Sequence, residues 1–334
     1  MKHKKIKTAA GLVLALCCLP MTALALSPGD SVIPGGQVVG IRLDCDGVVV
    51  TSLARIETDD GAVSPAGEAG IRPGDRILSL NGSAVHSGKD FQTAAAALQG
   101  EEAELVVERG DSVFRATVQP QKSERDVWQL GLWLRDGVSG IGTVTFYDPE
   151  SGLFGALGHG VEMPECGGLL PALHGEITRA SVADVVPGEK GAPGELCGVP
   201  EPATVWGSLE KNTEAGIFGH AGRALSGREA LPLAADAEIH PGPVTILSTV
   251  SGEEVQSYSA ELVRIGSESG DARQLTLHIT DPALLERTGG IVQGMSGSPL
   301  LQDGRLIGAV THVLVSDPTK GYGISAENML REIA

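Results

Sequence analysis

The first third of the chain alternates between short apolar runs and turn residues. Runs of about five residues that are rich in β-branched side chains and bounded by Gly, Asn or Asp predict strands. The predicted strands are Val48–Thr51, Arg76–Leu80, Ala103–Glu108 and Val113–Val118. One segment differs, because Phe91, Ala95 and Leu98 recur at helical spacing and predict a short amphipathic helix over 89–99. Strands arranged around one helix indicate a small α+β domain over residues 36–120.

The rest of the chain continues with short strands and glycine turns. Thr143–Phe146 follows a glycine, and Phe154–Leu157 precedes one. The chain has 46 glycines and only 3% aromatic residues, which favours a mostly β protein with many turns. Its 334 residues are enough for two domains. We therefore expect a second β-rich domain over 131–334, after a polar linker over 121–130.

The first 25 residues have the pattern of a targeting segment. Its basic residues are Lys2, Lys4, Lys5 and Lys7. The apolar run Ala9–Leu19 follows, and Ala23-Leu24-Ala25 is an A-x-A cleavage signal. We expect residues 1–25 to be a signal peptide and the protein to be exported, with 26–35 as an N-terminal segment. A retained signal anchor is the alternative, because residues 8–26 are almost long enough to span a bilayer.

Without residues 1–25 the chain is strongly acidic. That segment holds four of the 25 basic residues and none of the 42 acidic ones, which leaves a net charge of −21. This charge argues against nucleic acid as a partner. An acidic surface keeps the protein solvated and would also favour basic substrates.

Cysteine usage and motif content argue against metals and cofactors. Cys45, Cys166 and Cys197 remain in the exported part without C-x-x-C spacing, so neither a zinc cluster nor a disulfide-dense scaffold is expected. A single bridge between Cys166 and Cys197 stays open. The sequence contains no H-E-x-x-H or Walker motif, and Gly140-x-Gly142 lacks the third glycine of a dinucleotide site.

The segment Gly290–Leu301 offers a serine nucleophile. Ser296 stands in a Gly-x-Ser-Gly-x-Pro turn between apolar segments. A serine hydroxyl needs a base to take its proton and backbone amides to receive the oxyanion. Gly294 and Gly297 give the turn unusual backbone freedom, and the N–H groups of Gly294 and Ser296 are the expected oxyanion hole. The alternative is a Gly/Ser-rich connection between two core strands.

His159 is the candidate base, since it ends an apolar strand between two glycines. Imidazole can both take the serine proton and return it to the leaving amine. Asp281, directly after the alternating strand Leu275–Thr280, is the candidate that orients this ring. Asp281-Pro282 is equally a good helix start, with aspartate as the N-cap. The competing residues are Asp184 and Asp236 for the acid, and His174, His220, His240, His278 and His312 for the base.

The order His159, Asp281, Ser296 is similar to that of chymotrypsin-like serine peptidases, in which two antiparallel β-barrels meet at the active site. An α/β-hydrolase fits worse, because Ser298 stands where the G-x-S-x-G elbow needs glycine. Met295 occupies the position where trypsin-like enzymes usually carry an aspartate, so their zymogen mechanism is not implied. The resemblance implies a chymotrypsin-like double β-barrel over 131–334.

The run Ala69–Gly82, AGIRPGDRILSLNG, resembles the signature of bacterial protease-type PDZ domains. The resemblance implies that Val38, Val39, Gly40 and Ile41 form the loop whose amides hold a peptide C-terminal carboxylate. The peptide would then add as a strand beside the helix. A degenerate module that only packs against its neighbour is the alternative.

Taken together, several strings resemble the stage IV sporulation protein B serine peptidases of endospore-forming bacteria over residues 32–334. They are Val32–Gln37, Gly142–Tyr147, Ala156–His159, Gly216–Gly219, Thr280–Pro282, Gly294–Pro299, Ala309–His312 and Asp317–Gly323. In that family an exported, PDZ-containing serine peptidase signals between forespore and mother cell. It cleaves a membrane-bound regulator and so releases an intramembrane protease that processes a pro-sigma factor.

The family's base, acid and nucleophile match His159, Asp281 and Ser296. The resemblance also implies self-cleavage within residues 26–60 and a location between the forespore and mother-cell membranes, with membrane anchoring before processing. Asp281 lies only 15 residues before Ser296, a shorter interval than is usual in chymotrypsin-like enzymes. The rival interpretation is a non-catalytic scaffold, in which a PDZ module and an inert peptidase-like barrel tether partners.

Overall fold

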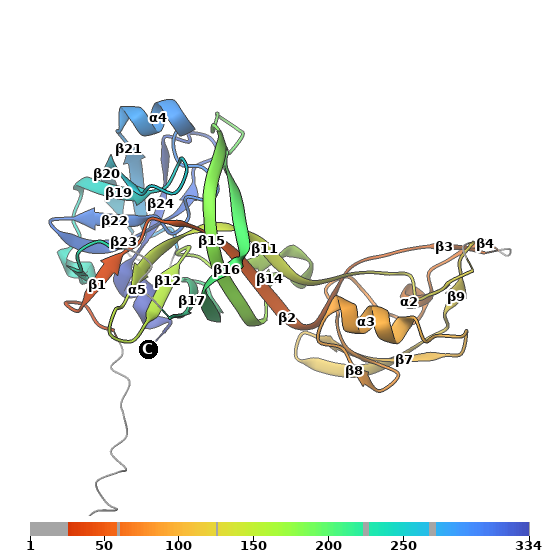
Figure 1. Ribbon diagram of the computed structural model, residues 1–334. Helices are drawn as coiled ribbons and strands as arrows, with labels where there is room; N and C mark the ends of the chain where they lie inside the picture. The colour runs from red at the N-terminus through yellow and green to blue at the C-terminus, as the bar shows by residue number, and fades with distance from the viewer. Residues whose placement is uncertain (1–25, 59–60, 125, 223–226, 267–271, 334) are drawn as a thin grey trace, which may run out of the picture.

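A computed structural model describes residues 26–58, 61–124, 126–222, 227–266 and 272–333. The chain is mostly β, and a small domain stands away from the main body at the end of two long strands (Figure 1). The expected targeting segment, residues 1–25, lies outside the described residues. No helix within the described ranges is long and apolar enough to cross a membrane.

The first half of the main body is a ring of six antiparallel strands, each hydrogen-bonded to the next. In ring order they are β2 (Val38–Leu53), β11 (Leu132–Tyr147), β12 (Leu153–Ala156), β17 (Gly216–Ala221), β16 (Glu195–Thr213) and β15 (Ala172–Val186). Buried apolar side chains such as Ile41, Phe154 and Ile177 fill this barrel. Outside the ring lie β1 (Ser31–Pro34), β13 (Glu162–Met163), η1 (Pro164–Cys166), β14 (Gly168–Leu169), β18 (Leu231–Pro232) and η2 (Asp236–Glu238).

The second half is a closed barrel of six strands. In ring order they are β19 (Gly242–Ser248), β20 (Gln256–Ile265), β21 (Leu275–Ile279), β24 (Lys320–Ser325), β23 (Arg305–Val313) and β22 (Pro299–Gln302). Strand β20 shows why these sequences form strands, because Tyr258, Ala260 and Leu262 alternate with exposed residues and point into the core. Two helices complete this half, α4 (Pro282–Thr288) and α5 (Ala326–Arg331). Two six-stranded barrels in succession confirm the chymotrypsin-like architecture expected from the sequence.

The small domain carries the run that resembles the PDZ signature, and it has its own apolar core; we refer to it as the PDZ domain. Its elements are β3 (Ile56–Thr58), β4 (Gly61–Val63), α2 (Pro65–Glu68), β5 (Arg76–Leu80), β6 (Ser83–Ala84), α3 (Gly88–Ala95), β7 (Ala103–Arg109), β8 (Ser112–Val118), β9 (Gln121–Lys122) and β10 (Trp128–Gln129). Helix α3 begins at Ser87, whose hydroxyl accepts the Asp90 N–H, and it buries Phe91.

Asp75 explains the Pro-Gly-Asp turn of the PDZ signature. Its side chain is only 1% exposed, and its carboxylate accepts two hydrogen bonds from the Arg109 guanidinium, at 2.6 and 2.7 Å. The Arg72 N–H donates a third, at 2.8 Å. A buried carboxylate is stable only when it is paired and hydrogen-bonded, so Asp75 fixes the entry into β5.

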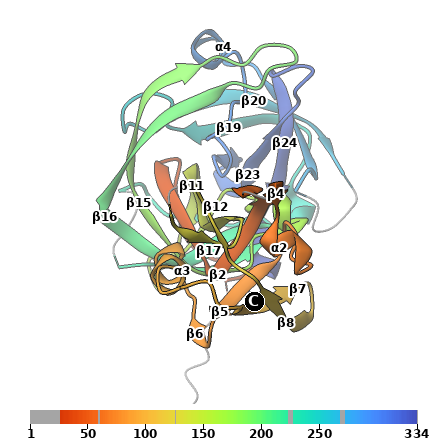
Figure 2. The same ribbon diagram turned by 90° about the vertical axis from the view of Figure 1, so that its right-hand side faces the viewer.

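The PDZ domain is an insertion in the first barrel. Strands β2 and β11 pair with each other from Leu53–Leu132 at the PDZ end to Val38–Thr143 in the barrel, with a register shift beside Gly137. Figure 2, which views the molecule from the PDZ side, shows both strands running from this domain into the barrels behind it. The predicted boundaries at 36, 120 and 131 are therefore wrong, because β2 and β11 each belong partly to the PDZ domain and partly to the barrel. A strand that crosses from one domain into the next gives no turn signal in the sequence.

Cys197 carries a free thiol in this structure. The bridge to Cys166, which the sequence left open, is therefore not formed. The barrel is held by its strand ladders and apolar core without that link.

Candidate active site

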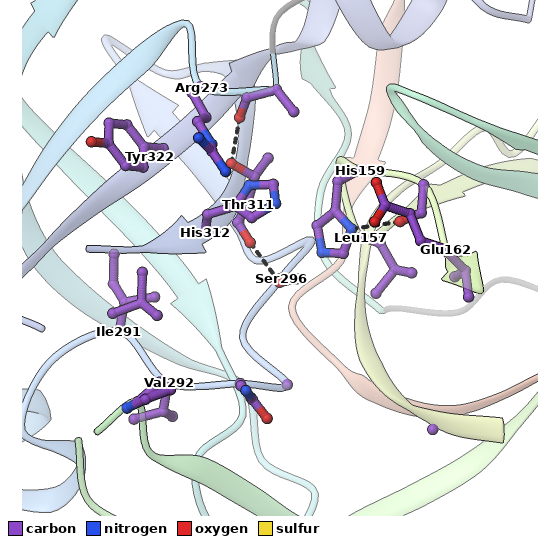
Figure 3. Close-up of a pocket in the computed structure, with 18 of the residues that line it drawn as sticks. Leu157, His159, Glu162, Arg273, Ile291, Val292, Ser296, Thr311, His312 and Tyr322 are labelled. Carbon is purple, nitrogen blue, oxygen red and sulfur yellow. Dashed lines mark hydrogen bonds between the residues drawn. The ribbon is translucent and has the colours of Figure 1, made fainter. Parts of the chain in front are cut away.

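A cavity of about 1210 Å³ lies between the two barrels (Figure 3). Ser296, in the turn before β22, and His159, in the turn after β12, both line it. Figure 3 shows the His159 ring and Ser296 close to each other on one side of this space. Residues of the strands that carry the PDZ domain, including Ile41 and Ile141, form part of the wall. The structure thus brings together two of the three residues expected to carry the chemistry.

Two glycines give the Ser296 turn its shape. Gly294 and Gly297 both have φ near +94°, a left-handed conformation that favours glycine. A Cβ on Gly297 would overlap the Thr143 carbonyl oxygen and lie 2.5 Å from the Leu157 nitrogen. The Gly297 N–H donates to the Val310 carbonyl at 2.7 Å. The turn is therefore pressed directly against backbone from both barrels.

The directions of the Gly294 and Ser296 N–H groups are set by hydrogen bonds to the carbonyl of the same peptide group. In a trans peptide the C=O and N–H point in opposite directions. The Gln293 carbonyl accepts from the Leu196 N–H at 2.9 Å, and the Met295 carbonyl accepts from the Ser298 N–H at 2.9 Å. Within the described residues, the Gly294 and Ser296 N–H groups donate to no protein acceptor. Both amides therefore stay available to a bound group, and their role as an oxyanion hole stays a prediction.

The Ser296 hydroxyl occupies a resting position. Its Oγ donates to the Thr311 carbonyl at 2.6 Å, and its side chain is half-buried. Catalytic hydrogen bonds are often made only when substrate is bound. A rotation about χ1 would therefore be needed to direct the hydroxyl proton toward His159.

Local backbone geometry places His159. Leu157 and Gly158 before it have φ near +70°, and a Cβ on Gly158 would come within 3.0 Å of side-chain methyl groups of Ile324 and Thr311. The His159 Nδ1–H donates to the Gly160 carbonyl at 2.8 Å, and this bond fixes the tautomer because a carbonyl only accepts. Nε2 is then the unprotonated nitrogen and can accept the serine proton.

Asp281 does not take the orienting role predicted for it. Its carboxylate accepts N–H groups from Ser259, Ala283 and Leu284, at 3.0 to 3.1 Å. It is the N-cap of α4 and does not line the cavity. The helix-start alternative describes its position, and the Gly160 carbonyl holds the imidazole instead.

The competing residues are also placed elsewhere, with one exception. Asp184, beside Arg287, and Asp236, beside Arg331, do not line the cavity. The same is true of His174, His220, His240 and His278. His312 does line it, with its ring centroid 4.8 Å from that of His159. Its place in the string Ala309–His312 could have suggested this, but nothing in the sequence pointed to the Gly160 carbonyl.

Comparisons with known proteins decide the family. A family model described as SpoIVB peptidase S55 matches residues 126–330, and a PDZ domain model matches residues 61–109. This chain belongs to the SpoIVB peptidase S55 family. The nucleophile turn and the histidine loop both lie in the part that the peptidase family model matches.

Two curated proteins, both named as zinc metalloproteases, match short stretches of this S55 peptidase. CPE1693 of Clostridium perfringens is 39% identical over 69 residues, 21% of each chain. BH06270 of Bartonella henselae is 33% identical over 88 residues, 26% of this chain and 24% of its own. The chain thus spans about a fifth to a quarter of the length of these relatives. An inactive serine-to-alanine form of Rv3671c from M. tuberculosis, a solved structure, is 13% identical, with 58% of this chain and 80% of that one covered and a TM-score of 0.32.

The described residues of the S55 peptidase contain no group of three or more His, Cys, Asp or Glu side chains arranged to hold a metal ion. The cavity presents the Ser296 hydroxyl, the His159 imidazole and the Gly294 and Ser296 backbone amides. These are the groups that acyl transfer requires.

The pH profile of the peptidase should carry an acid limb set by His159. Burial lowers the pKa of His159 below 6.5, against the opposing effects of the Gly160 hydrogen bond and the Glu162 charge. Only the neutral ring can take the serine proton, so kcat/KM should rise with pH through a midpoint below 6.5. Glu162→Gln removes a negative charge that raises this pKa, so it should move the limb to still lower pH. A parent limb centred above 7, measured between pH 4.5 and 8.5, would contradict the assignment.

Asp281→Asn should leave the folded peptidase active. An aspartate that truly orients the histidine costs about 10⁴-fold in kcat when changed to asparagine. Here we expect kcat to stay within about tenfold of the parent, because the carboxylate only caps α4. Asp281→Ala should lower the free energy of unfolding by about 1 kcal/mol through loss of the cap. Steady-state kinetics and thermal unfolding measure the two effects. A 10⁴-fold loss of kcat in a folded Asp281→Asn variant would show that Asp281 does orient His159.

The residues predicted as the carboxylate loop of the PDZ domain lie elsewhere. Val38, Val39, Gly40 and Ile41 are buried in β2. All four pair with β11 on one side, and Val39 to Ile41 also pair with β15 on the other. A Cβ on Gly40 would lie 2.5 Å from the Thr178 hydroxyl. The prediction is therefore wrong, because a strand paired on both edges has no amides left for a peptide.

An open strand edge does exist in the PDZ domain, on β11. Between Leu132 and Asp136, β11 pairs with β2 on one edge, and no described strand pairs with the other. Helix α3 contacts β11, and its Gly88 N–H donates to the Asp136 carboxylate at 2.9 Å. Trp133 on this stretch is 64% exposed. An open edge beside a helix is the arrangement by which PDZ domains add a peptide strand.

Proposed function

We propose that this chain is an exported serine endopeptidase of sporulation signalling that cleaves a membrane-bound regulator and itself. The observation that carries the proposal is the meeting of Ser296 and His159 in one cavity of an S55-family chain. Cleavage of the regulator would release an intramembrane protease that processes a pro-sigma factor. The space between the forespore and mother-cell membranes is the proposed place of action.

The proposed chemistry is acyl transfer through Ser296. Its Oγ leaves the Thr311 carbonyl and attacks the substrate carbonyl carbon, while Nε2 of His159 takes the proton. The oxyanion accepts hydrogen bonds from the Gly294 and Ser296 amides. His159 then protonates the leaving amine, and water attacks the acyl-enzyme by the same route in reverse.

Self-cleavage is proposed close to the N-terminus. A peptidase cleft needs a segment that is free to extend into it, whereas Ser31–Pro34 and Val38–Leu53 are bonded into sheets. Gly29 is also held, since its N–H donates to the Leu233 carbonyl. Ser27 is held as well, because its N–H donates to the Asp30 carboxylate at 2.8 Å, so self-cleavage within residues 26–60 requires one of these segments to open first.

The proposed partner of the PDZ domain is a peptide with a free C-terminus, docked on the open edge of β11 beside α3. The unpaired edge at Leu132–Asp136 and the contact of α3 with β11 support this docking site. It replaces the position first expected at Val38–Ile41. The rest of a protein docked by its C-terminus would then lie close to β11, the strand that leads to the catalytic cavity.

The experiment is a replacement of the chromosomal Ser296 by alanine in sporulating cells, with immunoblots for the regulator and the pro-sigma factor. Both proteins should accumulate uncleaved, while Ser257→Ala, a change of an exposed serine, should behave as the parent. Normal processing in cells that contain the Ser296→Ala protein would refute the signalling role.

A further inference from the structure

Thr143 links the two catalytic loops through every polar group that it has. Its N–H donates to the Ser296 carbonyl at 2.9 Å, and its Oγ1 donates to the Gly294 carbonyl at 2.9 Å. Its own carbonyl accepts from the Leu157 N–H at 3.2 Å, two residues before His159. The side chain is fully buried. One residue of β11 therefore contacts both the nucleophile turn and the histidine loop.

We propose that Thr143 is a positioning residue that holds the Ser296 turn and the His159 loop in the relative position that catalysis requires. This inference rests on the proposed acyl-transfer chemistry at Ser296. The Oγ1 bond fixes the peptide plane between Gly294 and Met295, which lies between the two planes that carry the oxyanion donors. Thr143 thus acts on those donors without touching substrate.

The other holds on this turn do not replace the hydroxyl. Leu196 orients the plane before Gly294, and the Ser298 N–H orients the plane before Ser296. Thr145, two residues along β11, donates its hydroxyl to the Gly297 carbonyl at 2.9 Å, beyond the nucleophile. The plane between the donors is held by Thr143 Oγ1 at its carbonyl and, through a longer bond of 3.2 Å, by the Val292 carbonyl at the Met295 N–H. With φ near +94° at Gly294, loss of the shorter bond would leave this plane held only by the longer one.

Thr143→Val tests the proposal, because it keeps the shape of the side chain and removes only the hydroxyl. Loss of a direct oxyanion donor costs about 100- to 1000-fold in kcat, so loss of a residue that positions the donors should cost about 10- to 100-fold. KM should change by less than about threefold, because the ground-state carbonyl depends little on these amides. Thr143→Ser, which restores the hydroxyl, should recover most of kcat.

A transition-state probe separates positioning from a general loss of structure. A peptidyl boronic acid with leucine at its reacting end forms a tetrahedral adduct with Ser296, whereas the uncleaved peptide of the same sequence binds only in the ground state. Thr143→Val should weaken the boronic acid by the same factor as kcat and leave ground-state binding unchanged. Leucine suits the apolar wall formed by Ile291, Val292 and Val313.

Thr249→Val is the matched control. Thr249 is also buried and also donates its hydroxyl to a glycine carbonyl, that of Gly36 at 3.0 Å, and it does not line the cavity. It should lower thermal stability without the specific loss of boronic acid affinity. If Thr143→Val kept kcat and boronic acid affinity within about twofold, or lost no more of either than Thr249→Val, the proposal would be overturned. Labelling of the parent by a fluorophosphonate shows separately whether Ser296 is a nucleophile at all.

Discussion

Ser296→Ala should lower kcat/KM for a peptide substrate by about 10⁴- to 10⁶-fold, the largest effect expected in this protein. The variant keeps the turn and its amides but has no oxygen to attack the carbonyl. His159→Ala should cost nearly as much, because it removes the Nε2 atom that takes the serine proton. The double variant should be no worse than either single one, since the two residues act as a unit.

Ser298→Ala is a useful comparison for this prediction, because Ser298 lies in the same turn. Its hydroxyl donates to the Ser248 hydroxyl at 3.0 Å and lies outside the cavity lining. The variant should lose some stability but keep its chemistry. Equal losses in Ser296→Ala and Ser298→Ala would point to a disrupted turn and not to a lost nucleophile.

Gly297→Ala should be the most damaging of the small substitutions, with kcat/KM at least about 100-fold lower. Two costs combine at this position: a φ near +94° that alanine rarely adopts, and a Cβ that overlaps the Thr143 carbonyl. The neighbours are backbone atoms of β11 and of the His159 loop, and they cannot move aside alone. A displacement of about 1 Å at a reacting group can itself cost about 100-fold in rate.

Gly304→Ala separates the two costs, because Gly304 has φ near +74° but no atom within 4 Å of the place that a Cβ would take. It should lose only about 1 to 2 kcal/mol of stability from the backbone conformation and keep its activity. Thermal unfolding and kinetics of both variants give the comparison. A Gly297→Ala protein as active as Gly304→Ala would show that the turn is not packed as described.

Features set by local sequence were predictable. The strand predicted at Arg76–Leu80 is β5 residue for residue, and the Ser296 turn has the positive φ angles that its glycines indicate. His159 could be named because an apolar strand ends at glycines beside it. In each case the chemistry of a few neighbouring residues determines the geometry.

Features set by distant pairing were not predictable. The segment Val38–Ile41 is apolar in either setting, and only its pairing with two other strands shows that it belongs to the barrel. The sequence around Asp281 is compatible both with a helix N-cap and with the acidic member of a His-Asp-Ser triad. The choice depends on where α4 lies in three dimensions. The Gly160 carbonyl carries no sequence signal, because every residue has a carbonyl.

The central claim is that Ser296 is a nucleophile activated by His159, and active-site labelling with a fluorophosphonate tests it most directly. Purified residues 26–334 should be labelled at Ser296, as mapped by mass spectrometry, and the label should disappear in Ser296→Ala and His159→Ala. Absence of label in a folded parent, or a full label in His159→Ala, would contradict the account.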